Sequence, residues 1–211
     1  MTATTSWFFD PLPLFAYDLA EIDPPWPFEL RSAKGGQKSP QRHYKRVMTL
    51  AEIAAMPVGD LLAPRSGILV MWTTWPLLAN GTASAIVKRW GLEPVTGGGW
   101  NKRTASGKLR WGTGYVQRSV HEPYIIGKLP GTAWRGAGFP NLVETLESDA
   151  MDGLARENSR KPDEFYQRCE AAMPNARRVS IFSRQTRAGW DTWGDESTKF
   201  DECDTGREVA V

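Results

Sequence analysis

The chain has 211 residues, of which 41% are hydrophobic and 24% are charged, with a formal net charge of +2. These values are ordinary for a globular protein, and the length suits one domain with a sizeable core. The sequence contains no apolar run of transmembrane length and no N-terminal signal-peptide pattern, so we expect a cytoplasmic protein.

The first expected strand, residues 17–22, ends at a proline pair. A loop rich in Gly, Ser and Lys follows to about Val47. Thr49 and Glu52 have the spacing of a capping box, in which each side chain bonds the other residue's backbone N–H. A helix is therefore predicted to begin here and to run towards Leu62.

Residues 67–73 (GILVMWT) are continuously apolar, which predicts a strand that is buried on both faces. The segment 76–90 predicts a helix that ends before Gly91, since glycine suits the residue after a helix. A further strand is expected over 94–100, interrupted or ended by the glycines at 97–99.

The second half of the chain continues the alternation of strands and helices. We expect a strand over 123–127, an irregular segment over 131–140, a helix over 162–173 and a strand over 178–183. Alternating strands and helices predict an α/β fold in which helices cover both faces of a mostly parallel sheet.

Such sheets bind ligands beyond the carboxyl ends of their strands. Asp23-Pro-Pro-Trp26 follows the first expected strand, and Arg184 follows the last. The sequence therefore predicts that both segments lie near one crevice.

The two cysteines, Cys169 and Cys203, are too few and too far apart for a disulfide framework or a Cys-x-x-Cys site. Only His43 and His121 could add imidazole ligands, so we expect no metal site.

Positive charge is concentrated in two segments, 28–46 and 101–118. The first has six Lys and Arg residues against one acid, and the second has five and no acid. This distribution suggests a polyanionic partner, although charge alone favours the simpler interpretation of two solvated loops.

The Asp-Pro-Pro-Trp motif has the groups that methylation of an aromatic amine requires. The amine is a poor nucleophile because its lone pair is delocalised into the ring. The Asp23 carboxylate and the Pro24 carbonyl could accept from its N–H groups and localise that pair, and Pro25 would keep the turn rigid. Trp26 offers a ring on which a base could stack. Taken alone, the proline pair fits a simple turn as well.

Further motifs in register give a resemblance that covers about residues 17–196. They are His43-Tyr44, Met48-Thr49-Leu50, Val70-Met-Trp-Thr73, Trp90-Gly91, Trp100-Asn-Lys102, Arg118, His121-Glu122, Gly127, Asn158-Ser-Arg-Lys-Pro-Asp-Glu164, Ile181-Phe-Ser-Arg184 and Gly189-Trp-Asp-Thr-Trp-Gly-Asp-Glu196. With Asp23-Pro-Pro-Trp26, they resemble the adenine-N6 methyltransferases typified by the seventy-kilodalton catalytic subunit of the eukaryotic messenger-RNA methyltransferase. That family also has bacterial and phage members.

The resemblance implies a single-domain class I, Rossmann-like methyltransferase sheet in permuted order, with the catalytic motif first and the cofactor half near the C-terminus. On this basis we expect a methyltransferase domain over 17–200, an N-terminal extension over 1–16 and an acidic, disordered tail over 201–211.

The implied cofactor is S-adenosyl-L-methionine. The positions that match cofactor-binding residues of the family are Asp23, Lys161, Phe182, Arg184, Asp195 and Glu196. Lys161 would hold the cofactor's carboxylate, and the two acids would lie near the ribose. The eukaryotic enzyme has amides in place of these acids and an asparagine in place of Arg187, so the sequence departs from it there.

The substrate side is expected to use residues from both basic segments: Tyr44, Lys102, Arg103, Lys108, Tyr115 and Arg118. The implied function is N6 methylation of adenine in DNA, on a single-stranded or flipped base. RNA is the alternative substrate. A catalytically inactive nucleic-acid-binding homologue is less favoured because the full motif and Lys161 are present. A protein-amide methyltransferase is less favoured because such enzymes prefer asparagine in the first motif position and because the basic segments argue against it. Whether the chain is a monomer or a homodimer stays open.

Overall fold

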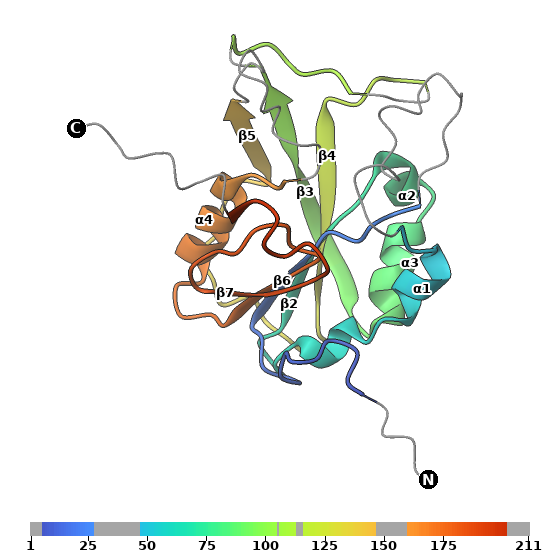
Figure 1. Ribbon diagram of the computed structural model, residues 1–211, viewed down its shortest axis with the longest axis vertical. Helices are drawn as coiled ribbons and strands as arrows, with labels where there is room; N and C mark the ends of the chain where they lie inside the picture. The colour runs from blue at the N-terminus through green and yellow to red at the C-terminus, as the bar shows by residue number, and fades with distance from the viewer. Residues whose placement is uncertain (1–5, 28–46, 105, 113–115, 147–159, 202–211) are drawn as a thin grey trace, which may run out of the picture.

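The computed structural model describes residues 6–27, 47–104, 106–112, 116–146 and 160–201 (Figure 1). Within these ranges, one sheet has seven strands: β1 (Leu19–Ile22), β2 (Ile68–Trp72), β3 (Glu93–Arg103), β4 (His121–Lys128), β5 (Leu142–Leu146), β6 (Arg178–Ile181) and β7 (Trp190–Trp193). The strand order is β5-β3-β4-β2-β1-β6-β7. β4 runs antiparallel to both of its neighbours, and every other adjacent pair is parallel. The expectation of a mostly parallel sheet is confirmed.

Helices cover both faces of this sheet, as expected for an α/β fold (Figure 1). The described helices are α1 (Leu50–Ala55), α2 (Trp75–Ala79), α3 (Thr82–Arg89) and α4 (Asp163–Ala172), with a 3-10 turn over Val58–Leu61. α4 lies on one side of the sheet in Figure 1, and α1, α2 and α3 lie on the other.

Each face of the sheet has its own hydrophobic cluster. Ala20 and Ile22 of β1 belong to the cluster under α1 and α3, whereas Leu19 belongs to the cluster under α4. This division follows from the alternation of side chains along a strand. All residues of β1 and β2 are buried, so the apolar run at 67–73 correctly indicated a central strand.

The capping box at the start of α1 is also confirmed. The Thr49 side chain accepts from the Glu52 N–H, and the Glu52 carboxylate accepts from the Thr49 N–H. The helix ends at Ala55 and does not continue towards Leu62, because Pro57 cannot extend it. A 3-10 turn replaces the expected last turns.

The single helix expected over 76–90 is wrong, since the structure has two helices there. Gly81 has a φ of 80° and separates α2 from α3. Glycine adopts this left-handed conformation without the strain that a side chain would cause.

The expectation that the glycines at 97–99 interrupt or end the third strand is also wrong. β3 continues through them to Arg103, because the glycines allow close packing against β4. A Cβ atom on Gly99 would lie only 1.9 Å from Nε2 of His121. Lys102 and Arg103 therefore belong to a strand rather than to a basic loop.

β5 and β7 form the two edges of the sheet and were not expected from the sequence. β7 contains Trp190 and Trp193, and it pairs in parallel with β6. β5 pairs in parallel with β3 at the opposite edge.

The packed part of the chain begins before residue 17, where the expected domain starts. Phe9 is fully buried, and its ring lies edge-on to Trp193 with 5.0 Å between the ring centroids. At the other end, the Asp201 carboxylate accepts from the N–H and hydroxyl of Thr186 at 2.8 and 2.9 Å. Described residues on both sides of the expected domain thus contact its core or its loops.

Replacing Phe9 by alanine tests whether the N-terminal segment is part of the cooperative fold. We expect Phe9→Ala to lower the free energy of unfolding in urea by about 3–5 kcal/mol, because it removes a fully buried ring. The control is Phe8→Ala, which should cost about 1 kcal/mol or less, since Phe8 is 45% exposed. Equal effects of the two changes would contradict this assignment.

Candidate functional site

The site is built around Asp23, the residue that follows β1. Its N–H donates to the Ile181 carbonyl of β6 at 3.2 Å, which continues the pairing of the two strands by one residue. The Asp23 side chain is 14% exposed. The carbonyl of Pro24 accepts from the Trp26 N–H at 2.8 Å, and that of Pro25 accepts from the Met48 N–H at 3.1 Å. The motif is therefore a turn held by backbone bonds, and each carbonyl keeps a second lone pair.

Trp26 anchors this turn to the sheet. Its indole N–H donates to the Trp72 carbonyl at 3.0 Å, and its ring is only 9% exposed within the hydrophobic cluster. Trp26 therefore exposes little surface in this structure for the base stacking that the sequence led us to expect.

Lys161 brings three distant segments together. Its ammonium lies 3.0 Å from Oδ2 of Asp23, and it also donates to Glu122 at the start of β4. The second oxygen of Glu122 lies 3.1 Å from the Lys102 ammonium of β3. The Lys161 ammonium is also 5.0 Å from the centroid of the Trp72 ring. Acids and bases thus alternate along a chain from β1 to β3.

These charges control the protonation of the two carboxyl groups. Burial alone would raise the pKa of Glu122, but the ammonium groups of Lys161 and Lys102 outweigh it and hold that pKa at about 2. Burial raises the pKa of Asp23, and the nearby Lys161 ammonium opposes this effect. Glu122 is therefore the firmly ionised member of the pair.

A narrow crevice lies beside Asp23. Three segments line it: the end of β1, the residues that lead into α4, and the turn after β6. The acids among its lining residues are Glu21 and Asp23. The cations are Arg160, Lys161, Arg184 and Arg187.

The turn after β6 has an unusual backbone at Phe182, whose φ is 61°. This left-handed conformation is rare for a bulky residue and often marks a functional site. The Phe182 N–H donates to the Trp193 carbonyl at 2.6 Å. In the same turn, the Ser183 hydroxyl donates to the Gln185 carbonyl at 2.6 Å. The crevice wall is therefore a strained turn that hydrogen bonds hold in place.

Arg184 and Glu196 form an ion pair of 2.8 Å at the crevice wall. Arg184 is buried, and its guanidinium carbon lies 5.1 Å from the centroid of the Phe200 ring. Neither Glu196 nor Asp195 is among the described lining residues, and Asp195 is exposed. Of the two acids expected near a ribose, the structure thus links only Glu196 to the crevice.

Several lining residues were not expected as site residues. Arg187, noted in the sequence only as a departure, lies 3.0 Å from Oδ1 of Asp163 and packs on Tyr166, 3.7 Å from the ring centroid. Glu21 was also missed, although a glutamate within the apolar strand segment was a visible signal. Arg160, Tyr166, Ser183 and Gln185 carried no comparable signal.

The substrate side is only partly described. Tyr44, Tyr115 and the whole segment 28–46 lie outside the described residues. Lys102 pairs with Glu122, and Arg103 lies 2.9 Å from Glu144 of β5. Segment 101–118 contains no acid in its own sequence, but pairing in the sheet brings Glu122 of β4 and Glu144 of β5 to its cations. The absence of acids from the segment was therefore misleading.

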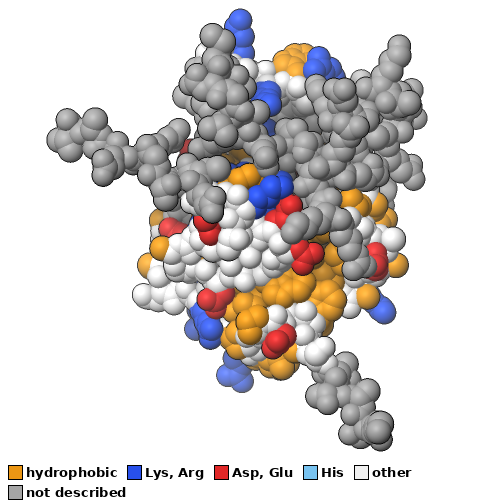
Figure 2. All heavy atoms as spheres, in the orientation of Figure 1, with side chains coloured by type: hydrophobic (Ala, Val, Ile, Leu, Met, Phe, Trp, Pro, Cys, Tyr) orange, Lys and Arg blue, Asp and Glu red, His pale blue; other side chains and the backbone are white. Residues whose placement is uncertain are grey.

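Lys108 and Arg118 differ from Lys102 and Arg103, since neither forms an ion pair among the described residues. The Arg118 guanidinium packs on the exposed ring of Trp111 and donates to the Gly112 carbonyl at 3.1 Å. Figure 2 shows Lys and Arg side chains at the end of the molecule where β3 terminates.

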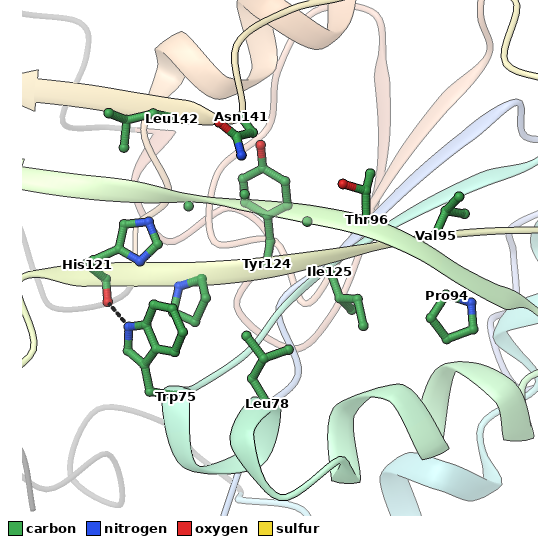
Figure 3. A pocket seen from close by; sticks show the side chains of 14 residues that line it. Trp75, Leu78, Pro94, Val95, Thr96, His121, Tyr124, Ile125, Asn141 and Leu142 are labelled. Atoms are coloured by element: carbon green, nitrogen blue, oxygen red, sulfur yellow. Dashed lines mark hydrogen bonds between the residues drawn. The ribbon is translucent and has the colours of Figure 1, made fainter.

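A larger groove lies across β3 and β4 and opens beside α2 (Figure 3). The Trp75 indole N–H donates to the His121 carbonyl at 3.2 Å, and the two rings lie 5.4 Å apart. Leu78 and Ile125 line the groove further along. Its described lining residues include no carboxylate and no Lys or Arg side chain, so the smaller crevice at Asp23 is the better candidate for chemistry.

A mostly parallel sheet with a charged crevice at the carboxyl ends of its strands is consistent with a methyltransferase fold. Residues 17–196 match the MT-A70 family model, and the chain belongs to this family. The match spans β1 to β7, and so includes both Asp23 and the turn after β6.

Curated relatives come from fungi, plants, animals and bacteria. The chain is 30% identical to the N6-methyladenosine RNA methyltransferase MTA1 of Cryphonectria parasitica over 88% of this chain and 53% of the relative. It is 26% identical to the N(6)-adenosine-methyltransferase MT-A70-like protein of Arabidopsis thaliana, over 87% of this chain and 24% of the relative. It is 27% identical to the type II methyltransferase M.MunI of Mycoplasma sp., over 88% and 80% of the two chains. The chain thus spans about half the length of the fungal relatives it matches.

The described residues include no helix that is both long and apolar enough to cross a membrane. They also include no group of three or more His, Cys, Asp or Glu side chains arranged to hold a metal ion.

The low pKa of Glu122 predicts how stability depends on pH. Its ionised form stabilises the fold above its ordinary pKa of 4.5, and this contribution is lost as the pH falls towards 2. The difference in free energy of unfolding between the wild type and Glu122→Gln should therefore shrink by on the order of 2–3 kcal/mol from pH 6 to pH 2.

Urea unfolding at several pH values measures this difference. The matched control is Glu144→Gln, which also removes a carboxylate that pairs with a β3 cation but lies at an exposed position. The control should show the smaller pH dependence. A pH-independent difference for Glu122→Gln would show that the carboxylate does not hold Lys161 as described.

Proposed function

We propose that the chain is an S-adenosylmethionine-dependent methyltransferase that acts on the exocyclic N6 of adenine in DNA. The observation that carries this proposal is the Asp23 carboxylate at the end of β1, beside a charged crevice, in a chain of the MT-A70 family. The names of several relatives, which specify adenine-N6 methyltransferases, support it.

The crevice residues fit the chemistry of this cofactor. Its amino-acid end carries an ammonium and a carboxylate, and the crevice offers Lys161 together with two acids, Glu21 and Asp23. Glu21 has a buried carboxylate oxygen without a hydrogen-bond partner. When bound, S-adenosylmethionine supplies a methyl group on a positively charged sulfur, which is transferred by in-line displacement.

The residues around the crevice would divide the binding among them. Lys161 would hold the carboxylate of the cofactor, and the ring of Phe182 would border its base. Arg184 orients Glu196, whose carboxylate would accept from ribose hydroxyls, and we assign the exposed Asp195 to the same part of the cofactor. These assignments keep five of the six expected cofactor residues, and Asp23 is assigned to the substrate amine instead.

Asp23 would act on the substrate amine. Its carboxylate, with the Pro24 carbonyl, would accept hydrogen bonds from the amine and make the nitrogen lone pair available for attack. Lys161 holds the carboxylate in position, while Pro25 and Trp26 hold the turn through backbone and indole hydrogen bonds. The target base must leave its stack to reach this depth.

The sheet order supports a permuted class I arrangement. The catalytic motif follows the first strand of the chain, and the crevice wall follows β6, yet β1 and β6 are neighbours in the sheet. Two segments that are distant in the sequence thereby form one site.

DNA is proposed as the substrate because the chain covers 80% of a type II methyltransferase, a class that modifies DNA. RNA is the second candidate, since the fungal relatives are named RNA methyltransferases and reach 30% identity. An inactive homologue is disfavoured because Asp23 and Lys161 both stand in the crevice and contact each other.

Asp23→Asn should abolish methyl transfer, with a loss on the order of a hundredfold or more in rate. Wild type and variant are each incubated with labelled S-adenosylmethionine and matched DNA and RNA oligonucleotides. The oligonucleotides are then digested to nucleosides, and the labelled nucleoside is identified. We expect label in N6-methyladenine from DNA with the wild type only. Thermal melting checks that the variant is folded. A folded Asp23→Asn enzyme with wild-type activity would remove Asp23 from the mechanism, and labelled RNA alone would select the second substrate.

The salt dependence of nucleic-acid binding should distinguish paired from unpaired cations. Lys108→Ala with Arg118→Ala should flatten the log–log salt slope on single strands by up to about 1.4 units, at about 0.7 per phosphate contact. Lys102→Ala with Arg103→Ala should have a smaller effect, because Glu122 and Glu144 already pair with these cations. Fluorescence anisotropy at several salt concentrations measures both. If the two double variants behave alike, the ion pairs do not persist in the complex.

A further inference from the structure

Glu21 is a buried carboxyl group in the central strand of the sheet. It is 1% exposed, and its neighbours along β1, Ala20 and Ile22, are fully buried apolar residues. One carboxylate oxygen accepts from the Ser180 hydroxyl of β6. The other, Oε1, is buried and has no hydrogen-bond partner in the described part of the chain, although Glu21 lines the crevice. An unsatisfied buried acceptor is costly, so it calls for an explanation.

The titratable and charged groups that act on Glu21 come from its own strand, from α4 and the residues before it, and from the segment before β7. Asp23 lies two residues further along the same strand, Lys161 precedes α4, and Arg187 precedes β7. The hydroxyl of Tyr166 and the thiol of Cys169 approach from α4. Burial is the largest effect, and it raises the pKa of Glu21 to about 7.

The two cations that act on this group, Lys161 and Arg187, are held by other acids. The Lys161 ammonium contacts Asp23 and Glu122, and the Arg187 guanidinium contacts Asp163. Glu21 therefore lines the crevice with an acceptor that no donor among the described residues satisfies. A ligand with a positively charged N–H group is the chemical class that would satisfy it.

We propose that Glu21 binds the α-ammonium of the cofactor's amino-acid end through its unpaired oxygen, while Lys161 holds the α-carboxylate. This inference rests on the proposed function, because it assumes that S-adenosylmethionine occupies the crevice. A cation and an acid lining one crevice match the two charges of an α-amino acid. Asp23, which the sequence resemblance also placed on the cofactor side, is engaged by Lys161, whereas Oε1 of Glu21 has no partner among the described residues, so we assign the ammonium to Glu21.

Binding of S-adenosylhomocysteine, followed by calorimetry, tests the proposal without any methyl transfer. Glu21→Gln and Glu21→Met both remove the carboxylate, and the affinity should fall about tenfold to a hundredfold, as expected for a hydrogen bond between charged groups. The matched control is Glu170→Gln on α4, which removes a carboxylate that accepts from the Trp190 indole N–H outside the crevice lining. This control should bind as the wild type does.

The deaminated analogue of S-adenosylhomocysteine separates the ammonium contact from a general effect on the crevice. It should bind the wild type more weakly, and the Glu21 variants should bind it no more weakly than the wild type does. If the variants lose affinity equally for both ligands, Glu21 has only a structural role and the proposal is overturned.

The pH dependence gives a second readout. The free protein holds Glu21 partly protonated near neutral pH, and the ammonium requires the ionised form. Affinity of the wild type should therefore rise from pH 5.5 to pH 7.5, with proton release on binding. The rise should vanish in Glu21→Gln and persist in Asp23→Asn, which removes the other buried carboxyl with a raised pKa.

The outcomes distinguish this inference from the function on which it rests. If the wild type does not bind S-adenosylhomocysteine, the proposed cofactor fails, and the role of Glu21 fails with it. If the wild type binds and folded Glu21 variants bind equally well, the cofactor stands and the ammonium contact is wrong. If the pH dependence disappears in Asp23→Asn instead, the ammonium belongs to Asp23.

Discussion

The buried Lys161 ammonium between Asp23 and Glu122 is the interaction on which the site depends. A buried charge is tolerated only when it is paired. The Lys161 ammonium can therefore be buried only when Asp23, after β1, and Glu122, in β4, lie close together. Those strands are separated in the sheet by β2, and the chain that supplies Lys161 lies just before α4. The ion pairs therefore form only when the sheet is correctly ordered and α4 has packed on it. Removing any one of Asp23, Glu122 and Lys161 leaves a buried charge without its partner, so we expect the three groups to form their ion pairs together.

The remaining cations of the crevice follow the same rule. Arg184 is paired with Glu196, and Arg187 with Asp163, so each guanidinium has a fixed direction before any ligand arrives. Groups held in this way do not have to reorganise when charge develops nearby. The strained Phe182 backbone adds to this rigidity, because the Trp193 carbonyl holds it from β7. An edge strand of tryptophans thereby contributes to the site without lining it.

Local patterns predicted the parts of this structure that depend on local energetics. The apolar run that became β2 and the Thr49 capping box are visible within a few residues of sequence. The edge strands and the pairing of Lys102 and Arg103 with Glu122 and Glu144 depend on contacts between distant residues. No local window contains them, because the acids arrive only when β4 and β5 flank β3. The break at Gly81 was missed for another reason, since a glycine within a helical pattern does not reveal its φ.

Glu21 shows how a departure from a pattern can carry information. Its strand partner in β6 is Ser180, so two polar residues meet within a part of the sheet that is otherwise buried and apolar. An apolar pair of the same volume would serve stability as well or better, because buried ionisable groups rarely add net stability. The serine satisfies only one carboxylate oxygen, and the other is buried without a partner among the described residues. A polar pair placed only for packing would be expected to satisfy both oxygens from within the protein. The one-sided arrangement instead leaves an unsatisfied acceptor on a residue that lines the crevice, which is the pattern expected of a binding residue.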